Sequence, residues 1–352
     1  MSIQNYNELK NTDNETIIAL KHLLEKNTGS IVLITHENPD GDAIGSAVGL
    51  AEVLKNQGQS VTVITPNNCP KFLRWFSSEV DIIVHAKNKI EAEEVIENCE
   101  IIICLDFNEA KRAGELGEFI LGLSKLKVLI DHHPNPSEFC DYMFSEPGYS
   151  STSELIYEII EKIKFNKYLN RNAAEALYTG IMTDTGSFSH NVSDANVFRV
   201  AGNLISCGID TAKIQSNVYH NFSANRMKLL GYCLNKKMEV FPEYRSAVIS
   251  ITKKELKNFD YEPGDTEGFV NYPLSVNNIV FSALFIENDG YIKASFRSKG
   301  NFPANKFSRE HFDGGGHLNA AGGESKQMLD ETIIKFKQLL GQYTNLLNDT
   351  KI

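Results

Sequence analysis

Short apolar runs alternate with amphipathic stretches along the first half of the chain. Four of these runs are predicted strands: 30–35, 60–65, 100–105 and 127–130. The last two are apolar almost throughout, which is typical of a parallel sheet covered on both faces. Apolar positions at helical spacing predict four helices, over 7–27, 43–56, 153–164 and 173–183. The alternation predicts a doubly wound, mostly parallel α/β domain.

The pattern changes in the second half. It is helical from Asp194 to about residue 235, with a predicted break at Gly208 and Asp210, and strand-like from Met238 onward. The Asp289-Gly290 pair between two apolar runs is a hairpin signal. We therefore expect a first domain at 1–194, a helical linker at 195–235, and a smaller α/β domain with a mixed sheet at 236–345.

The length of 352 residues is consistent with two domains. No apolar run approaches the roughly 18 residues that a membrane span needs. The first residues are polar and lack a signal-peptide core, which favours a cytoplasmic location without a membrane partner. The six cysteines form no CxxC pair, so we interpret them as reduced core residues and not as a disulfide framework or a zinc site.

The net charge of −10 argues against binding of long duplex nucleic acid, which usually requires a basic surface. Part of the acidity can belong to metal ligands, whose charge the metals would cancel. A local basic patch is also compatible with an acidic chain.

The densest group of candidate functional residues follows the first predicted strand. His36, Asp40 and Asp42 lie within seven residues of one another, with Gly41 between the carboxylates, where a strand gives way to a helix. Open α/β sheets bind their ligands at this edge. A role as a helix cap would account for Asp42, but not for His36 and Asp40 beside it.

Further titratable residues stand at the ends of other elements. Asp106 ends one apolar strand, and Asp131-His132-His133 ends the next; three such groups together are costly to bury without a metal or a substrate. Asp184 closes a predicted helix. A glycine-ended helical turn is the structural alternative there, but a carboxylate is unfavourable at that end of a helix.

These positions together offer two imidazoles and four carboxylates: His36, Asp40, Asp42, Asp106, His132 and Asp184. The mixture suits two divalent cations. The imidazoles favour Mn²⁺, with Mg²⁺ or Co²⁺ as alternatives. Two ions about 3.5–4 Å apart would hold a phosphoryl group and activate a water molecule.

In order and context, these residues resemble the four motifs of the DHH superfamily of phosphoesterases, over roughly residues 30–190. That superfamily includes RecJ-type exonucleases, manganese inorganic pyrophosphatases and the nanoRNase and pAp phosphatases. The resemblance implies metal-dependent hydrolysis of phosphoesters. It also implies that the six residues bind the metals, with Asp106 as the bridging ligand.

Two segments of the second half, 296–299 (FRSK) and 314–323 (GGGHLNAAGG), resemble the DHH-associated C-terminal domain, although Leu318 stands where many relatives have proline. Pyrophosphatases of the superfamily carry a different, lysine-rich second domain, and RecJ-type enzymes are longer. The chain is therefore most similar to the group of nanoRNases, pAp phosphatases and dinucleotide phosphodiesterases.

Seven residues of these segments are candidates for substrate binding: Arg297, Ser298, Lys299, Gly314, Gly315, Gly316 and His317. Arginine offers a bidentate fork to phosphate, and glycines present backbone N–H groups. A flexible glycine loop beside a solvated run of charge is the structural alternative. Arg112 can reach a substrate phosphate or pair with a local glutamate. The serines at 150–153 are expected to cap a helix.

We predict a two-metal phosphodiesterase or phosphatase that converts short oligoribonucleotides, linear dinucleotides of the pApA type or pAp to nucleoside monophosphates. His133 is the candidate to contact the phosphate or protonate the leaving oxygen, and Asp131 to orient a neighbouring ligand. The alternatives are hydrolysis of cyclic dinucleotides or pyrophosphate, and a catalytically silent nucleotide sensor. The expected partner is short single-stranded RNA or a dinucleotide, and a homodimer is expected as the commonest assembly.

Overall fold

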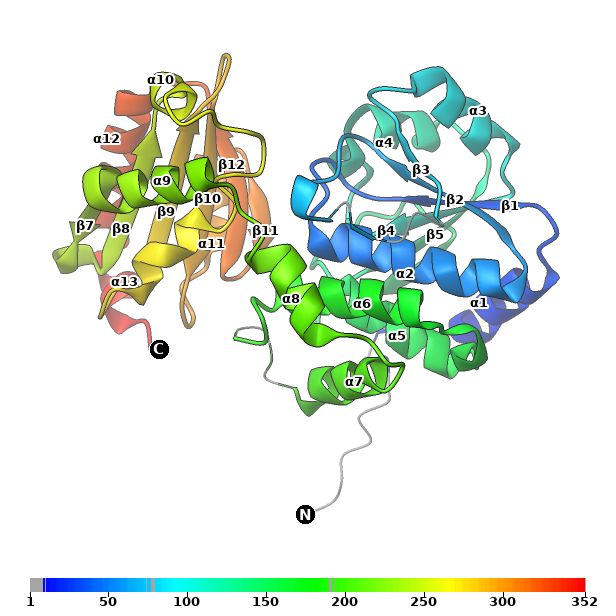
Figure 1. The fold of residues 1–352 in the computed structure, drawn as a ribbon. Helices are drawn as coiled ribbons and strands as arrows, with labels where there is room; N and C mark the ends of the chain where they lie inside the picture. The colour runs from blue at the N-terminus through cyan, green and yellow to red at the C-terminus, as the bar shows by residue number, and fades with distance from the viewer. Residues whose placement is uncertain are drawn as a thin grey trace. The chain divides into compact units, whose positions relative to one another are not determined.

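The computed structural model describes residues 9, 11–73, 75–76, 80–189, 192 and 194–351. The chain divides into two compact units, Met1–Asn221 and Phe222–Ile352, each with its own sheet and apolar core (Figure 1). Helices α7 (Ala195–Ile205) and α8 (Thr211–Tyr219) belong to the first unit, and α9 (Ala224–Tyr232) belongs to the second. Within the described ranges, no helix is long and apolar enough to cross a membrane.

The first unit is built on a six-stranded sheet in which all neighbouring strands are parallel. In spatial order the strands are β3 (Ile82–Val84), β2 (Ser60–Thr65), β1 (Ser30–Ile34), β4 (Ile101–Leu105), β5 (Leu126–Asp131) and β6 (Tyr142–Ser145). The strand order reverses between β1 and β4, as in other doubly wound folds. The predicted fold class is confirmed for this unit.

Alternate residues of the central strands face two different layers of helices. Ile31 and Ile103 belong to the core shared with α1 (Asn14–Lys26), α2 (Gly41–Gln57), α5 (Thr152–Lys162) and α6 (Arg171–Asp184). Val32 and Ile102 belong to the core shared with α3 (Lys89–Asn98) and α4 (Gly114–Leu121). Figure 1 shows these two layers on opposite sides of the sheet. The near-continuous apolar strands of the sequence are explained by burial on both faces.

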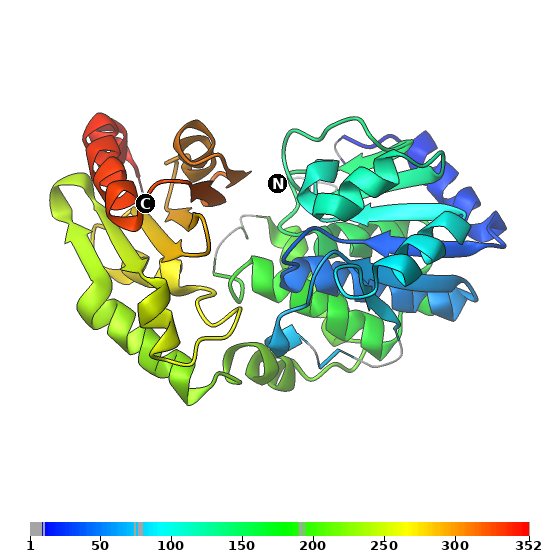
Figure 2. The same ribbon diagram turned by 90° about the horizontal axis from the view of Figure 1, so that it is seen from above.

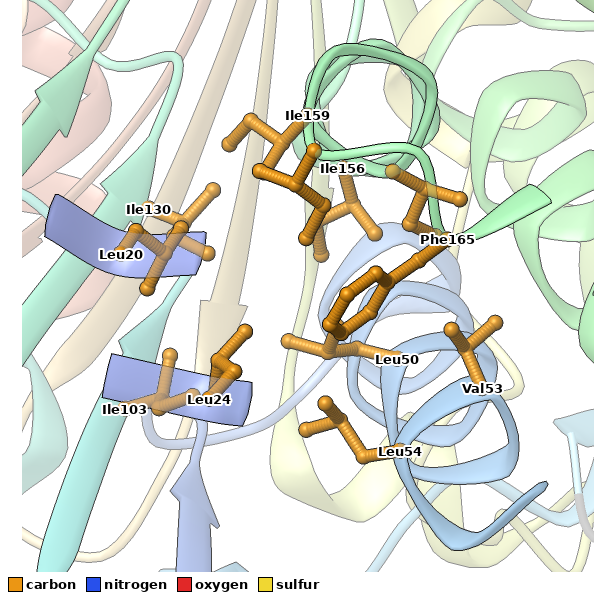
Figure 3. A pocket seen from close by; sticks show the side chains of 12 residues that line it. Leu20, Leu24, Leu50, Val53, Leu54, Ile103, Ile130, Ile156, Ile159 and Phe165 are labelled. Carbon is orange, nitrogen blue, oxygen red and sulfur yellow. The ribbon is translucent and has the colours of Figure 1, made fainter. Parts of the chain in front are cut away.

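Figure 3 shows the core where α1, α2 and α5 meet the sheet. The side chains around its cavity are all apolar, and the cavity measures only about 10 Å³. That volume is close to the minimum for a single water molecule, and no polar partner lines it. We interpret it as a small packing gap in a dry core and not as a binding site.

The structure corrects some element boundaries. The first helix begins at Asn14, after Asp13, whose side chain accepts a hydrogen bond from Thr16 N, so the start predicted at residue 7 is wrong. Residues 7, 8 and 10 themselves lie outside the described residues. The short strands β3 and β6 and the helices α3 and α4 were not predicted. Both strands are edge strands of three or four residues, too short for a clear apolar pattern.

The second unit contains a mixed sheet, as predicted. In spatial order its strands are β11 (Gly315–His317), β12 (Ala320–Ser325), β10 (Ile292–Ser298), β9 (Phe281–Glu287), β8 (Ser246–Ile251) and β7 (Met238–Phe241). Only the β8–β9 pair is parallel among the pairs described. β9 and β10 form the predicted hairpin, in which Asn288 N donates to Tyr291 O at 2.9 Å and Gly290 has a positive φ.

Helices cover both faces of this second sheet. Figure 2 shows α9 and α12 (Leu329–Gln342) on opposite sides of it. Leu229 of α9 packs with Ile249 and Leu284, whereas Phe336 of α12 packs with Phe281 and other phenylalanines. The remaining helices are α10 (Lys253–Lys257), α11 (Ala304–His311) and α13 (Thr344–Asp349).

Candidate metal centre

The predicted ligands gather at the carboxyl edge of the parallel sheet. His36 follows β1, Asp106 follows β4, and His132 follows β5. Asp42 lies in the first turn of α2, and Asp184 is the last residue of α6. Because α2 and α6 run side by side, they bring these two carboxylates to the strand ends (Figure 1).

The six side chains form two groups that meet at Asp106. His36 Nε2 lies 3.5 Å from Asp106 Oδ2 and 4.0 Å from Asp40 Oδ1. His132 Nε2 lies 3.6 Å from Asp106 Oδ1, 3.6 Å from Asp184 Oδ2 and 3.8 Å from Asp42 Oδ2. The donor atoms of His36, Asp40 and Asp106 lie within 4.8 Å of one another, as do those of Asp42, His132 and Asp184. Each Asp106 oxygen therefore faces a different group.

Both imidazoles are held by their other nitrogen. His36 Nδ1 is 2.8 Å from the carbonyl oxygen of Glu37, and His132 Nδ1 is 3.2 Å from that of Tyr149. A carbonyl can only accept, so each Nδ1 donates its proton in these bonds, and Nε2 is the ring nitrogen that faces the carboxylates. Metal-binding histidines are commonly oriented in this way.

The start of α5 fixes the carboxylate of Asp42. Thr152 N and Ser153 N donate to its two oxygens at 2.6 and 2.9 Å, and Thr152 Oγ1 donates to Asp106 Oδ1 at 2.8 Å. Gly180 of α6 permits this approach, because a Cβ there would lie 1.9 Å from Ser153 Oγ. Asp42 is not the cap of α2. That role belongs to Asp40, whose Oδ1 accepts from Asp42 N and Ala43 N.

Burial and mutual repulsion shift the pKa values of these groups. Burial raises the pKa of Asp42 and of Asp184 well above the usual range, and neighbouring carboxylates add to the effect. Burial also acts to raise the pKa of Asp106, but its hydrogen bond with His36 and the nearby imidazoles lower it to about 2. Burial acts to lower the pKa of His36 and of His132, but their carboxylate neighbours outweigh it and raise both.

The residues present fit divalent cations. Asp184 Oδ2 is buried, and within the described ranges it has no hydrogen-bond partner. Four carboxylates and the Nε2 atoms of two imidazoles converge here, and each Nε2 can bind a cation once it has released its proton. Oxygen and imidazole donors in this ratio suit Mn²⁺ and similar ions. The described residues thus contain clusters that can hold a metal.

A second histidine–carboxylate pair adjoins these groups. His133 Nδ1 lies 2.7 Å from Asp131 Oδ1 and 3.7 Å from Asp106 Oδ1, and both partners of the pair are buried. Burial, with the nearby charge of Asp106, raises the pKa of Asp131 to about 7. The carboxylate that was predicted to orient a neighbouring ligand contacts His133 in the structure.

Arg112 lies in a short 3₁₀ helix, Ala110–Ala113, that follows Asp106. Its carbonyl oxygen accepts a hydrogen bond from Glu37 N at 2.7 Å, which ties this helix to the loop carrying His36. Arg112 is partly exposed and makes no ion pair with a carboxylate in the described part of the chain, and the local glutamate Glu109 pairs with Lys111 instead. The charge of Arg112 helps to lower the pKa of Asp106.

In the second unit, the residues of the FRSK segment have different surroundings. Arg297 donates to the carbonyl of Phe296 at 3.0 Å and is partly exposed. Ser298 is buried, donates to Phe302 O and accepts from Asn319, so its hydroxyl stabilises the loop after β10. Lys299 Nζ donates to the carbonyl of Leu274.

The GGGH segment is an ordered edge strand and not a flexible loop, because Gly315–His317 pairs with β12. Two of its glycines are required, one by close packing and the other by its backbone conformation. A Cβ at Gly314 would lie 2.0 Å from the carbonyl oxygen of Gly322, and Gly316 has a φ of 137°. A Cβ at Gly315 would meet nothing within 4 Å, so the packing of this unit does not explain why this position is glycine.

Several residues that hold the centre together were not singled out from the sequence. Ser151 caps α5 as expected, but Thr152 and Ser153 also hold Asp42 and Asp106, and Tyr149 holds His132. The run of hydroxyl residues at 150–153 was the available signal. It indicated a helix start, but nothing in the sequence indicated which carboxylates that helix start would face.

Comparisons with known proteins agree with the motifs. The family model described as DHH family, N-terminal domain matches residues 30–181, and the DHHA1 domain matches residues 246–345. The chain is 30% identical over 297 residues to the bifunctional oligoribonuclease and PAP phosphatase NrnA of Bacillus subtilis, covering 83% of this chain and 88% of that protein. It is 28% identical over 315 residues to the probable enzyme of the same name from Streptococcus mutans, covering 88% and 95%.

One solved structure is similar over nearly the whole chain. It is the crystal structure of an exopolyphosphatase-related protein from Bacteroides fragilis, with 40% identity, a TM-score of 0.91, and coverage of 97% of this chain and 99% of that one. The chain belongs to the DHH family, a family of phosphoester hydrolases. The resemblance inferred from the motifs is thereby confirmed in both halves.

Proposed function

We propose that the chain is a two-metal phosphodiesterase and phosphatase that converts short oligoribonucleotides, linear dinucleotides of the pApA type and pAp to nucleoside monophosphates. The observation that carries this proposal is the position of Asp106 between two groups of histidine and aspartate side chains. Relatives that match over most of their length are named as oligoribonucleases and PAP phosphatases, which supports the choice of substrate.

The proposed cofactors are two divalent cations, with Mn²⁺ preferred. His36, Asp40 and Asp106 would hold one ion, and Asp42, His132, Asp184 and the other oxygen of Asp106 would hold the second. When bound, such ions supply an activated water and neutralise charge that develops on the phosphoryl oxygens. Thr152 keeps Asp106 and Asp42 oriented for this role.

His133 and Asp131 form the proposed proton-transfer pair. Asp131 accepts from His133 Nδ1. The proposed role of His133 is to contact the phosphate or to give a proton to the leaving oxygen. A carboxyl group with a pKa of about 7 beside an imidazole can share a proton with it at neutral pH. Arg112, Arg297, Lys299, Gly315 and His317 are the proposed contacts for the rest of the substrate.

The test is turnover of pApA, pAp and pyrophosphate, each with Mn²⁺ and with a chelator. The wild type is compared with His132→Ala and with His22→Ala, which removes an exposed histidine of α1. We expect Mn²⁺-dependent release of AMP from pApA that is lost in His132→Ala and unchanged in His22→Ala.

Other outcomes would replace parts of the proposal. Turnover of pyrophosphate alone would keep the metal centre but remove the nucleotide substrate. Turnover of a cyclic dinucleotide without turnover of pApA would move the activity to the cyclic compounds. Binding of Mn²⁺ without turnover of any of these compounds would indicate a nucleotide sensor.

A further inference from the structure

A buried carboxylate outside the predicted ligand set lies behind the candidate metal centre. Glu154, in the first turn of α5, is 2% exposed. Its Oε2 accepts from both N and Oγ of Ser150, at 2.8 and 2.6 Å, and its Oε1 accepts from Asn196 Nδ2 at 3.0 Å. These bonds join α5 and α7 to the turn at residues 149–151.

That turn reaches two of the predicted ligands. On one side, the carbonyl of Tyr149 accepts from His132 Nδ1 and so sets the orientation of the imidazole. On the other side, Ser151 caps α5, whose first N–H groups donate to both oxygens of Asp42. The position of the turn therefore determines how His132 and Asp42 face each other.

We propose that Glu154 is a positioning residue for the metal centre: it fixes the turn at 149–151 and thereby orients His132 and Asp42 for cation binding. The inference rests on the proposed metal-dependent function. Within the described part of the chain, Glu154 makes no hydrogen bond with His132 or Asp42, so it acts through Ser150 and the turn. Truncation of Glu154 would leave Ser150 N, itself buried, without an acceptor, and the turn would shift to find one.

The expected loss of Mn²⁺ affinity can be judged from other metal sites, in which residues that hydrogen-bond to the ligands orient them. Removing such a group typically weakens metal binding by about 10–100-fold, because the ligands no longer sit in the geometry the ion requires. We expect this range for Glu154→Ala.

Glu158 provides a matched control. It lies one helical turn further along α5, is 1% exposed, and accepts from the same Asn196 Nδ2 at 2.9 Å as well as from Arg199. Its hydrogen bonds lead to α7 and not to the turn at 149–151. Glu158→Ala therefore removes a buried carboxylate of the same network without releasing the turn.

The experiment measures Mn²⁺ affinity of the full chain by calorimetry after removal of bound metal, together with thermal unfolding in the absence of metal. We expect Glu154→Ala to bind Mn²⁺ about 10–100-fold more weakly than wild type. Glu154→Gln keeps an oxygen that can accept from Ser150 and should recover most of the affinity. Glu158→Ala should unfold at a lower temperature but bind Mn²⁺ as the wild type does.

Equal affinities of wild type and Glu154→Ala would overturn the inference, as would equal weakening in Glu154→Ala and Glu158→Ala. A wild type that binds no Mn²⁺ would overturn the proposed function itself, and the two failures are thus distinguishable. If Glu154→Ala does not fold, Ser150→Ala tests the same turn from its other end. We expect it to weaken Mn²⁺ binding several-fold, and an unchanged affinity would overturn the inference.

Discussion

Several side chains of the candidate centre are fixed by hydrogen bonds to the backbone through one atom, while another of their atoms faces the other residues of the centre. His36 and His132 donate through Nδ1 to backbone carbonyls, and Asp42 accepts two backbone N–H groups. Asp106 has a φ of 66°, a left-handed conformation that is tolerated by aspartate but still unusual. Strain of this kind is found at functional sites, where the surrounding structure maintains it.

The first prediction concerns Asp184→Asn. Because burial raises the pKa of Asp184, its charged form is unfavourable in the metal-free protein, and a neutral amide of the same shape should not lower stability there. At a Mn²⁺ concentration of 100 times Kd the wild type should gain about 2.7 kcal/mol in unfolding free energy. If the variant binds 100-fold more weakly, its gain falls to about 0.4 kcal/mol. Denaturant unfolding with and without Mn²⁺ measures both values, and an undiminished gain in the variant would exclude Asp184 as a ligand.

The second prediction concerns pH. Asp42, Asp131 and Asp184 have raised pKa values, so the folded metal-free protein binds more protons than the unfolded chain above about pH 4. Its stability should therefore fall as the pH rises toward 7, and the raised pKa values of His36 and His132 extend the fall above 6.5. Asp106, with a pKa of about 2, acts in the opposite direction only below about pH 4.

A bound cation replaces those protons, so the stabilisation by Mn²⁺ should increase between pH 5 and 8. Thermal unfolding of metal-stripped and Mn²⁺-loaded protein over this range measures the increment. If the stabilisation by Mn²⁺ does not change with pH, the carboxyl groups with raised pKa values are not the groups that bind the metal.

At the residue level, much of the site could be predicted from the sequence, because titratable residues that directly follow predicted strands can be recognised without a structure. The structure places all six predicted ligands in two adjoining groups. The hydrogen-bond partners that tertiary packing brings to these ligands could not be predicted. The bonds from Thr152 and Ser153 to Asp42 join residues 110 and 111 positions apart, and no local pattern records them.

At the level of elements, the parallel strands and the packing of α2 on α6 determine where the ligands meet. The four central strands of the first sheet were predicted closely because burial on both faces leaves long apolar runs. The start of α1 was wrong because Asp13 caps the helix after the apolar pattern has already begun. The close approach of α2 and α6 could not be read from the sequence. It depends on glycines facing a backbone that is distant in sequence.

The third prediction compares two glycines of α2 with a glycine of α7 that faces no neighbour. A Cβ at Gly45 would lie 2.6 Å from Ala176 O and 2.8 Å from Gly180 N, which are backbone atoms that cannot move independently. A Cβ at Gly49, on the same helix, would meet the side chain of Leu177, and one at Gly202 of α7 would meet nothing within 4 Å. Alanine improves helix propensity by about 1 kcal/mol at each position, so the differences report packing.

We expect Gly202→Ala to stabilise the protein by about 0.5–1 kcal/mol. Gly45→Ala should destabilise it by about 1–3 kcal/mol, with Gly49→Ala in between. Only Gly45→Ala should also weaken Mn²⁺ binding, because it separates α6, with Asp184, from α2, with Asp42. Urea unfolding and calorimetry measure the two effects, and equal stability of Gly45→Ala and Gly202→Ala would contradict the packing argument.

For the whole chain, charge is divided unequally between the two units. Residues 222–352 contain 17 lysines and arginines and 15 acidic residues, so the net charge of −10 originates entirely in residues 1–221. The acidity therefore belongs to the unit that carries the candidate metal centre. Bound cations would offset part of it, and a second unit of nearly balanced charge suits short substrates with few phosphates.

The last prediction separates the two units. All six predicted ligands and the hydrogen bonds that orient them lie within Met1–Asn221, which has its own apolar core. A fragment of residues 1–221 should therefore unfold cooperatively and bind Mn²⁺ with the affinity of the full chain. Its hydrolysis of pApA should fall by about 100-fold or more, because Arg297 and His317, the proposed substrate contacts, are missing and the substrate is no longer positioned.

Arg297→Ala in the full chain is the matching control, with weaker pApA binding and unchanged Mn²⁺ affinity expected. A fragment that hydrolyses pApA at the rate of the full chain would remove the second unit from substrate binding. A folded fragment that no longer binds Mn²⁺ would instead show that ligands outside residues 1–221 complete the centre. Mn²⁺ affinity and pApA hydrolysis therefore test separately whether the first unit binds the metal and whether the second unit binds the substrate.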